Sequence, residues 1–161
     1  MIDRVDTLAD TYQNQRFCSL HFSSIPYSSL GTTPHLHVSQ VVEAARVCAL
    51  RGAQLLAVMG ANSDPFTLDT ICRVRAFENG CHVVYANQQG GAFCGRSVCV
   101  APTGVVLGQS PAEEDDGGRG TGCGGLLVEV APDDEAFAAC RRRNPFFAVR
   151  QPTMYTAITD H

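Results

Sequence analysis

The pattern of hydrophobic and polar positions changes character several times between residues 41 and 107. Residues 41–50 mix apolar and charged side chains as one helix would, whereas residues 53–58 are almost entirely apolar. A second helical segment has charged and polar residues in its last turns and stops at Gly80. A run of β-branched and aromatic residues follows that glycine. The pattern predicts a helix, a strand, a second helix and three further strands, at residues 43–50, 53–58, 66–79, 81–86, 97–101 and 105–107.

This order of elements is typical of a layered α/β fold in which helices cover one face of a sheet. The apolar run at 53–58 is expected of a strand that is covered on both faces. Ser63 or Asp64 is suited to cap the second helix, with Pro65 in its first position. Gly80 then provides the left-handed residue that commonly ends a helix.

The two ends of the chain differ from this centre. Residues 1–38 have no sustained period and contain many Ser, Thr, Pro and His residues, so they are predicted to be irregular. Residues 39–161 are predicted to form the domain. Within it, residues 108–125 are rich in glycine and acidic residues and are expected to be the least ordered part. A last strand is predicted at 126–130 and a helix at 132–143.

Several short pieces also occur in the order and spacing of one protein family. The chain resembles the carboxyl-terminal half of the carbon–nitrogen hydrolase (nitrilase/amidase) superfamily over about two thirds of its length. This resemblance implies a partial α-β-β-α sandwich and a role of the carboxyl-terminal tail in packing against a second subunit. The matching pieces are Glu43-Ala-Ala-Arg46, Leu50-Arg-Gly-Ala-Gln-Leu-Leu56, Arg75-Ala-Phe-Glu-Asn79, Val83-Val-Tyr-Ala-Asn87, Gly95-Arg-Ser97, Pro102-Thr-Gly104 and Arg150-Gln-Pro-Thr-Met-Tyr155.

The charge and the amino-acid composition of the chain exclude some classes of binding partner. A net charge of −4 without a basic stripe argues against a nucleic-acid partner, and no apolar run is long enough to cross a membrane. No secretory signal is visible, so a cytoplasmic protein with reduced cysteines is expected. All twelve basic residues are arginine, and the sequence contains no lysine.

The missing lysine bears on catalysis, because superfamily amidases are expected to use a Glu base, a Lys and a Cys nucleophile. Their nucleophile begins a Cys-x-Asp-x-x-Phe-Pro-Glu pattern whose last residue corresponds to Glu43, which places Leu36 at the nucleophile position. No catalytic residue is therefore assigned. The chain is predicted to be inactive alone and to serve as an assembly partner, in a homo-oligomer or with an intact relative.

The same resemblance implies a vestigial substrate pocket formed by Ala61, Asn62 and Glu78, with Glu78 supporting the fold rather than the chemistry. Two alternatives remain open. One is an active amidase that uses Cys94 or Cys99 with Glu78, and the other is a product with a scrambled start that aggregates.

No cofactor or metal ion is expected from the sequence. The eight cysteines include no Cys-x2-Cys pair, and those in apolar runs are better explained as small core residues. His35 and His37 are expected to be solvated. Residues 120–125 match Gly-x-Gly-x-x-Gly, but an acidic loop precedes them and a strand is expected after them, so no nucleotide site is predicted.

Overall fold

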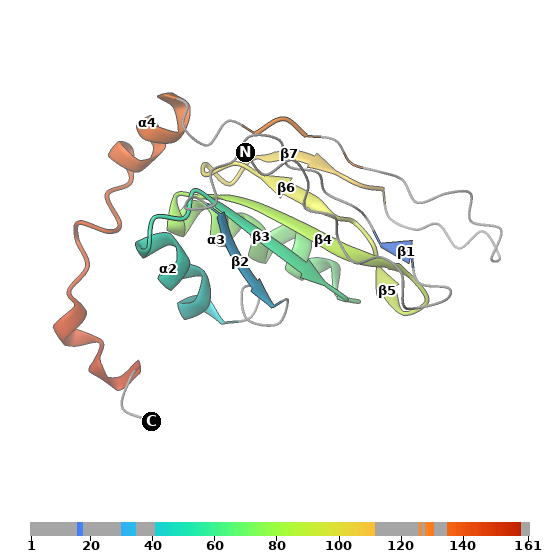
Figure 1. The fold of residues 1–161 in the computed structure, drawn as a ribbon, viewed down its shortest axis with the longest axis horizontal. Helices are drawn as coiled ribbons and strands as arrows, with labels where there is room; N and C mark the ends of the chain where they lie inside the picture. The colour runs from blue at the N-terminus through green and yellow to red at the C-terminus, as the bar shows by residue number, and fades with distance from the viewer. Residues whose placement is uncertain are drawn as a thin grey trace.

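The computed structural model describes residues 16–17, 30–34, 41–111, 126, 128–130 and 135–158. These residues form a mixed sheet (Figure 1). Its main path follows the order β2 (Leu30–Pro34), β3 (Leu55–Gly60), β4 (His82–Gly90), β6 (Val98–Val100) and β7 (Val106–Gln109). The first three strands are parallel, and β6 and β7 join antiparallel. Two short strands, β1 (Arg16–Phe17) and β5 (Phe93–Cys94), pair with the far end of β4.

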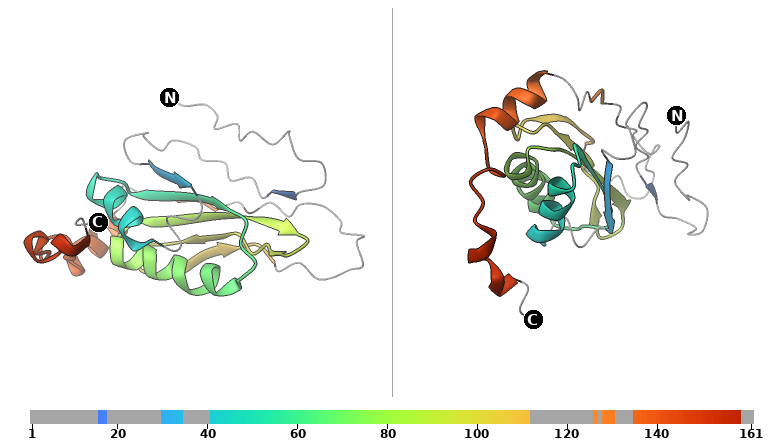
Figure 2. Two further views of the ribbon diagram at one scale, coloured as in Figure 1. Left: turned by 90° about the horizontal axis from the view of Figure 1, so that it is seen from below. Right: turned by 60° about the vertical axis from the view of Figure 1, so that its left-hand side comes forward.

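Helices cover one face of this sheet (Figure 2). The first is α2 (Val42–Leu50), and the second begins with a π-helical turn, Thr67–Ile71, that continues into α3 (Cys72–Asn79). Beyond them, α4 (Glu135–Arg143) is followed by two short 3₁₀ turns, Pro152–Met154 and Thr156–Ile158. The α/β class expected from the sequence is confirmed.

The core lies between these helices and the sheet. Side chains from both helices meet alternate residues of the strands, so that Ala45, Ala76 and Leu68 are fully buried against Leu56 and Val83. The intervening strand residues Leu55, Val84 and Cys99 face the other side, where Val128 and Val130 pack on them. Both faces of the central strands are therefore covered, which explains why their sequences are nearly continuous apolar runs.

The predicted boundaries of the central elements are close to the observed ones. Gly80 takes the left-handed conformation with φ 55° and ends α3. Of the two candidate caps, Asp64 makes the bond, because its Oδ1 accepts the backbone N–H of Phe66 at 2.9 Å. The strand expected at 81–86 extends to Gly90, since β1 and β5 provide partners for its last residues.

Three details differ from the sequence predictions. Residues 30–34, expected to be irregular, form β2, because pairing with β3 supplies a ladder that the Leu-Gly-Thr-Thr-Pro sequence does not signal. The described residues of the expected strand 126–130 belong to no strand. They contact the second face of the sheet through side chains instead. The first full turn of the second helix is π-helical rather than α-helical.

The expected helix at 132–143 is described from Glu135 onward. In the part of the chain that the structure covers, no helix has the length and apolarity needed to cross a membrane.

Candidate functional site

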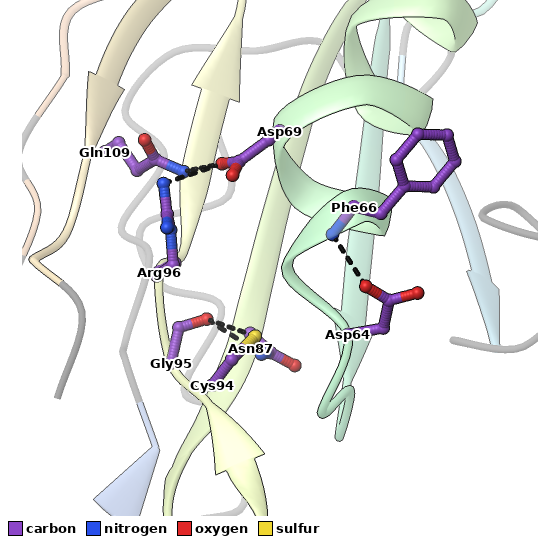
Figure 3. Close-up of polar contacts among 8 residues, drawn as sticks. All are labelled: Asp64, Phe66, Asp69, Asn87, Cys94, Gly95, Arg96 and Gln109. Carbon is purple, nitrogen blue, oxygen red and sulfur yellow. Dashed lines mark hydrogen bonds and ion pairs between the residues drawn. The ribbon is translucent and has the colours of Figure 1, made fainter.

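The candidate site lies where the parallel strands β3 and β4 end. Gly60, the last residue of β3, pairs with Asn87 in β4, and the chain then turns into the loop that leads to the second helix. Open α/β sheets bind ligands outside the carboxyl ends of their parallel strands, because loops from neighbouring strands meet there. Asn87, Cys94 and Gly95 lie together at this edge, with Asp69, Arg96 and Gln109 beside them (Figure 3).

Asn87 organises this edge. Its side chain is buried, and its Oδ1 accepts the backbone N–H of Asn62 at 2.8 Å. Its Nδ2 donates to the carbonyl of Asn62 at 2.9 Å and to that of Gly95 at 2.7 Å. One amide therefore links the loop after β3 to the turn after β5, and all of these bonds serve to hold the backbone.

Cys94 is the thiol at this edge, and it is half-buried. Its Sγ donates to the carbonyl of Asn62 at 3.2 Å, and Asn87 Nδ2 lies 3.4 Å from the sulfur. Burial raises the pKa of the Cys94 thiol above its ordinary value, and this outweighs a backbone hydrogen bond and the charge of Arg96, which lower it. The thiol is therefore protonated at neutral pH and is a poor nucleophile.

A polar triad lies beside this network. Asp69, in the π-helical turn, accepts hydrogen bonds at 2.9 Å from Arg96 Nη2 and from Gln109 Nε2, both on its Oδ1. Arg96 has a φ of 57°, a conformation that costs energy for a residue with a Cβ. The ion pair is partly exposed, so it contributes little to stability. Its effect is to tie the turn after β5 to the start of the second helix.

The three residues of the predicted pocket are not brought together. Ala61 and Asn62 directly follow β3, at the carboxyl edge. Glu78 lies near the end of α3, four residues before β4 begins, and so at the opposite end of the parallel strands. There it pairs with Arg75 at 2.8 Å, which fits the supporting role that the resemblance implies. Leu36, which the resemblance places at the nucleophile position, is outside the described residues.

The other described cysteines lie in or against the packed interior. Burial raises the pKa of Cys72 to about 12 and that of Cys99 to about 11, and it also raises the pKa of Cys81. Among the described residues, no group of three His, Cys, Asp or Glu side chains is arranged to hold a metal ion. His35 and His37 are outside this part of the chain.

Sequence reasoning missed the role of Asn87 and the triad of Asp69, Arg96 and Gln109. Asn87 could have been found, because a polar residue near the end of an apolar strand marks the edge at which loops meet. The triad had no such signal, since its members lie 27 and 40 residues apart in the sequence.

Comparison with known proteins agrees with this architecture. Residues 39–122 match the family model described as carbon-nitrogen hydrolase. A hydrolase of Pseudomonas protegens is 34% identical over 123 residues, which are 73% of this chain and 39% of that protein. A probable nitrilase of Schizosaccharomyces pombe is 31% identical over 122 residues, covering 72% of this chain and 42% of the relative.

The fold is also similar to that of a carbon-nitrogen hydrolase from Helicobacter pylori G27, with a TM-score of 0.66 and 23% identity over 82% of this chain and 49% of the other. The chain thus spans well under half the length of the curated relatives it matches. Because the family model covers more than half of the 161 residues, this chain belongs to the carbon–nitrogen hydrolase family.

Proposed function

We propose that this domain of a carbon–nitrogen hydrolase does not hydrolyse amides by itself and acts as an assembly partner. One sequence observation carries the proposal. The chain contains no lysine, and its resemblance to the family aligns Leu36 with the nucleophilic cysteine of the family pattern. A leucine side chain cannot attack a carbonyl, and no arginine replaces a lysine without changing the geometry and hydration of the charge.

The chemistry of the candidate site supports the same conclusion. The side chain of Asn87 bonds the backbone of Asn62 and Gly95, and that of Asn62 accepts the backbone N–H of Asp64, so both amide groups are used in holding the edge together. The nearby thiol of Cys94 donates to carbonyl oxygens, and burial raises its pKa more than the charge of Arg96 lowers it. The polar groups of this site hydrogen-bond to the loops of the chain itself and are not available to polarise the carbonyl group of a substrate.

A second candidate function is an amidase that uses a non-standard cysteine. The observation in its favour is the position of Cys94, half-buried at the carboxyl edge of the parallel strands. Glu78, the base that this reading requires, lies at the other end of those strands and is paired with Arg75. Cys99 is buried in the second face of the sheet. We therefore rank this function below the first.

Hydrolysis assays separate the two functions. The purified 161-residue chain is incubated with simple aliphatic amides and carbamoyl amines, and released ammonia is measured beside an intact amidase as positive control. We expect no turnover above the blank. Turnover that disappears in Cys94→Ser but persists in Cys140→Ser would overturn the first proposal in favour of the second.

The assembly role is tested by the mass in solution. Light scattering is measured on the chain alone and after mixing with an intact family member from the same source. A stable homodimer or a defined mixed complex is the expected result. Polydisperse aggregate in both samples would contradict an assembly role and favour a product without function.

We also propose a cytoplasmic location. The described cysteines are free of disulfides, which fits this location.

A further inference from the structure

The chain after α4 is attached to the rest of the fold by two adjacent aromatic residues. Phe146 meets Phe77 of α3 edge to face, with the ring centroids 5.5 Å apart. Phe147 is half-buried and packs against the core cluster between the helices and the sheet. Residues 151–158, which follow, are all exposed. The two phenylalanines therefore anchor this exposed segment to the helices.

The ring of Phe147 contacts two cations that come from different helices. The guanidinium of Arg46, in α2, lies 5.3 Å from the ring centroid, and that of Arg141, in α4, lies 5.5 Å from it. The face of an aromatic ring attracts a cation, and it does so more strongly where water is excluded. Arg141 has other partners as well, because its Nε and Nη2 donate to the carbonyls of Gly80 and Ala53 at 3.1 and 3.2 Å.

Arg46 lies in an unfavourable place for a cation. Burial lowers the pKa of its guanidinium, the charge of Glu78 raises it, and that of Arg150 lowers it again. Its Nη1 is buried and meets no hydrogen-bond acceptor among the described residues. A partly buried charge needs a favourable contact to offset the loss of water. The ring of Phe147 supplies such a contact, so the side chain of Arg46 is suited to hold that ring in place.

We propose that Arg46 is a positioning residue for assembly, because it holds the ring of Phe147 and so fixes the direction in which residues 149–158 leave the domain. This inference rests on the proposed assembly role. The restraint is passed on by the backbone, since the N–H groups of Ala148 and Val149 both donate to the carbonyl of Pro145, at 3.0 and 3.3 Å. A segment that is already held in one direction loses less conformational freedom when it binds a second chain, which favours association.

The contact is tested with a matched pair of variants. Arg46→Gln and Arg51→Gln each remove one positive charge, and Arg51 is an exposed residue directly after α2. Amide hydrogen exchange over residues 145–149 of the full chain is followed by mass spectrometry, at a concentration low enough to prevent association. We expect exchange about fivefold faster in Arg46→Gln than in the parent, no change in Arg51→Gln, and near-parent exchange in Arg46→Lys, which keeps a cation over the ring. Equal rates in the parent and Arg46→Gln would overturn the proposal.

The role in assembly is tested with the same variants. Light scattering over a range of concentrations gives the dissociation constant for self-association and for association with the intact relative. Arg46→Gln is expected to raise this constant about fivefold, while Arg51→Gln and Arg46→Lys leave it near the parent value. A merely structural contact would change the exchange rate but not this constant, and that result would overturn the positioning role. If the parent chain associates with neither partner, the proposed function itself fails, and the exchange rates, measured without association, keep the two failures distinct.

Discussion

Single side chains hold the carboxyl edge of the sheet in place. Asn87 does this for two loops at once, since it bonds the backbone of both Asn62 and Gly95. Buried cysteines affect stability in a different way, because burial raises the pKa of the Cys72 and Cys99 thiols. The stability of the protein therefore depends on an amide at position 87 and on protonated thiols at the buried cysteine positions.

Asn87→Ala is expected to destabilise the chain strongly. The substitution removes three hydrogen bonds and leaves the N–H of Asn62 without its partner, whereas the carbonyl of Asn62 keeps the backbone N–H of Cys94 at 3.1 Å. The loss in the free energy of unfolding is expected to be about 2–4 kcal/mol, measured by urea denaturation. Gln151→Ala, at an exposed position, is the control and should cost almost nothing. A cost below about 0.5 kcal/mol for Asn87→Ala would show that water replaces these bonds.

The buried cysteines predict a loss of stability at alkaline pH. Folding raises the pKa of Cys99 to about 11 and that of Cys72 to about 12, from an ordinary value of 9.0. A raised pKa means that the folded state holds the proton more tightly. This contribution is complete below about pH 9 and is lost progressively as the pH rises toward 11 and 12.

Urea midpoints at pH 7.5 and pH 10 test this dependence. The midpoint of the parent chain is expected to fall between the two values, and that of Cys72→Ala/Cys99→Ala is expected to fall less. The matched variant Cys94→Ala removes a less buried thiol and should keep most of the parent's pH dependence. A double variant with the same pH dependence as the parent would contradict the assignment to these two thiols.

At the scale of elements, turns and helix ends decide how the layers meet. Gly80 ends α3 in the left-handed conformation and brings the chain directly into β4. Its Cα lies against α4, because a Cβ built there would be 3.2 Å from Cγ of Arg141. The same glycine therefore permits both a backbone conformation and a close contact between two helices.

Gly80→Ala is expected to cost more than Gly91→Ala. Gly91 has a similar φ of 67°, and a Cβ there meets nothing within 4 Å, so its substitution measures the backbone strain alone. That strain is about 1–2 kcal/mol. Gly80→Ala adds the displacement of Arg141 and should lose up to about 1 kcal/mol more, seen as a lower urea midpoint. Equal losses at the two positions would mean that the Arg141 side chain moves aside freely.

At the scale of the molecule, the surface carries apolar side chains that the described core does not use. After α4 the chain leads away from the sheet (Figure 1), and there Val149, Met154 and Ile158 are 66%, 72% and 56% exposed. Exposed apolar groups that gather on one segment are typical of surfaces that associate with another protein. This feature supports the proposed assembly role.

Met154→Asp is expected to reduce association. If the segment takes part in assembly, the parent chain should have a mass in solution above the 17.2 kDa of one copy, and a charge at position 154 should shift it toward that value. Thr153→Asp introduces the same charge at an adjacent exposed position and should have a smaller effect. Identical masses for the parent and Met154→Asp, by light scattering, would exclude this segment from the contact.

The sequence by itself determined the order of the central elements. Interactions between near neighbours are sufficient to predict these elements. A few adjacent residues encode each of the apolar runs of β3 and β4, the Asp64 cap and the left-handed Gly80. It also determined that no lysine is present, because this depends on residue identity alone.

Only the tertiary structure decided which distant residues meet. β2 exists because it pairs with β3, and residues 128–130 pack on the sheet without joining it, although their sequence is that of a strand. The structure also placed Glu78 at the opposite end of the strands from Asn62, and it left the buried Asn79 Oδ1 without a hydrogen-bond partner among the described residues. Contacts of this kind join residues that are far apart along the chain, and no local pattern of the sequence records them.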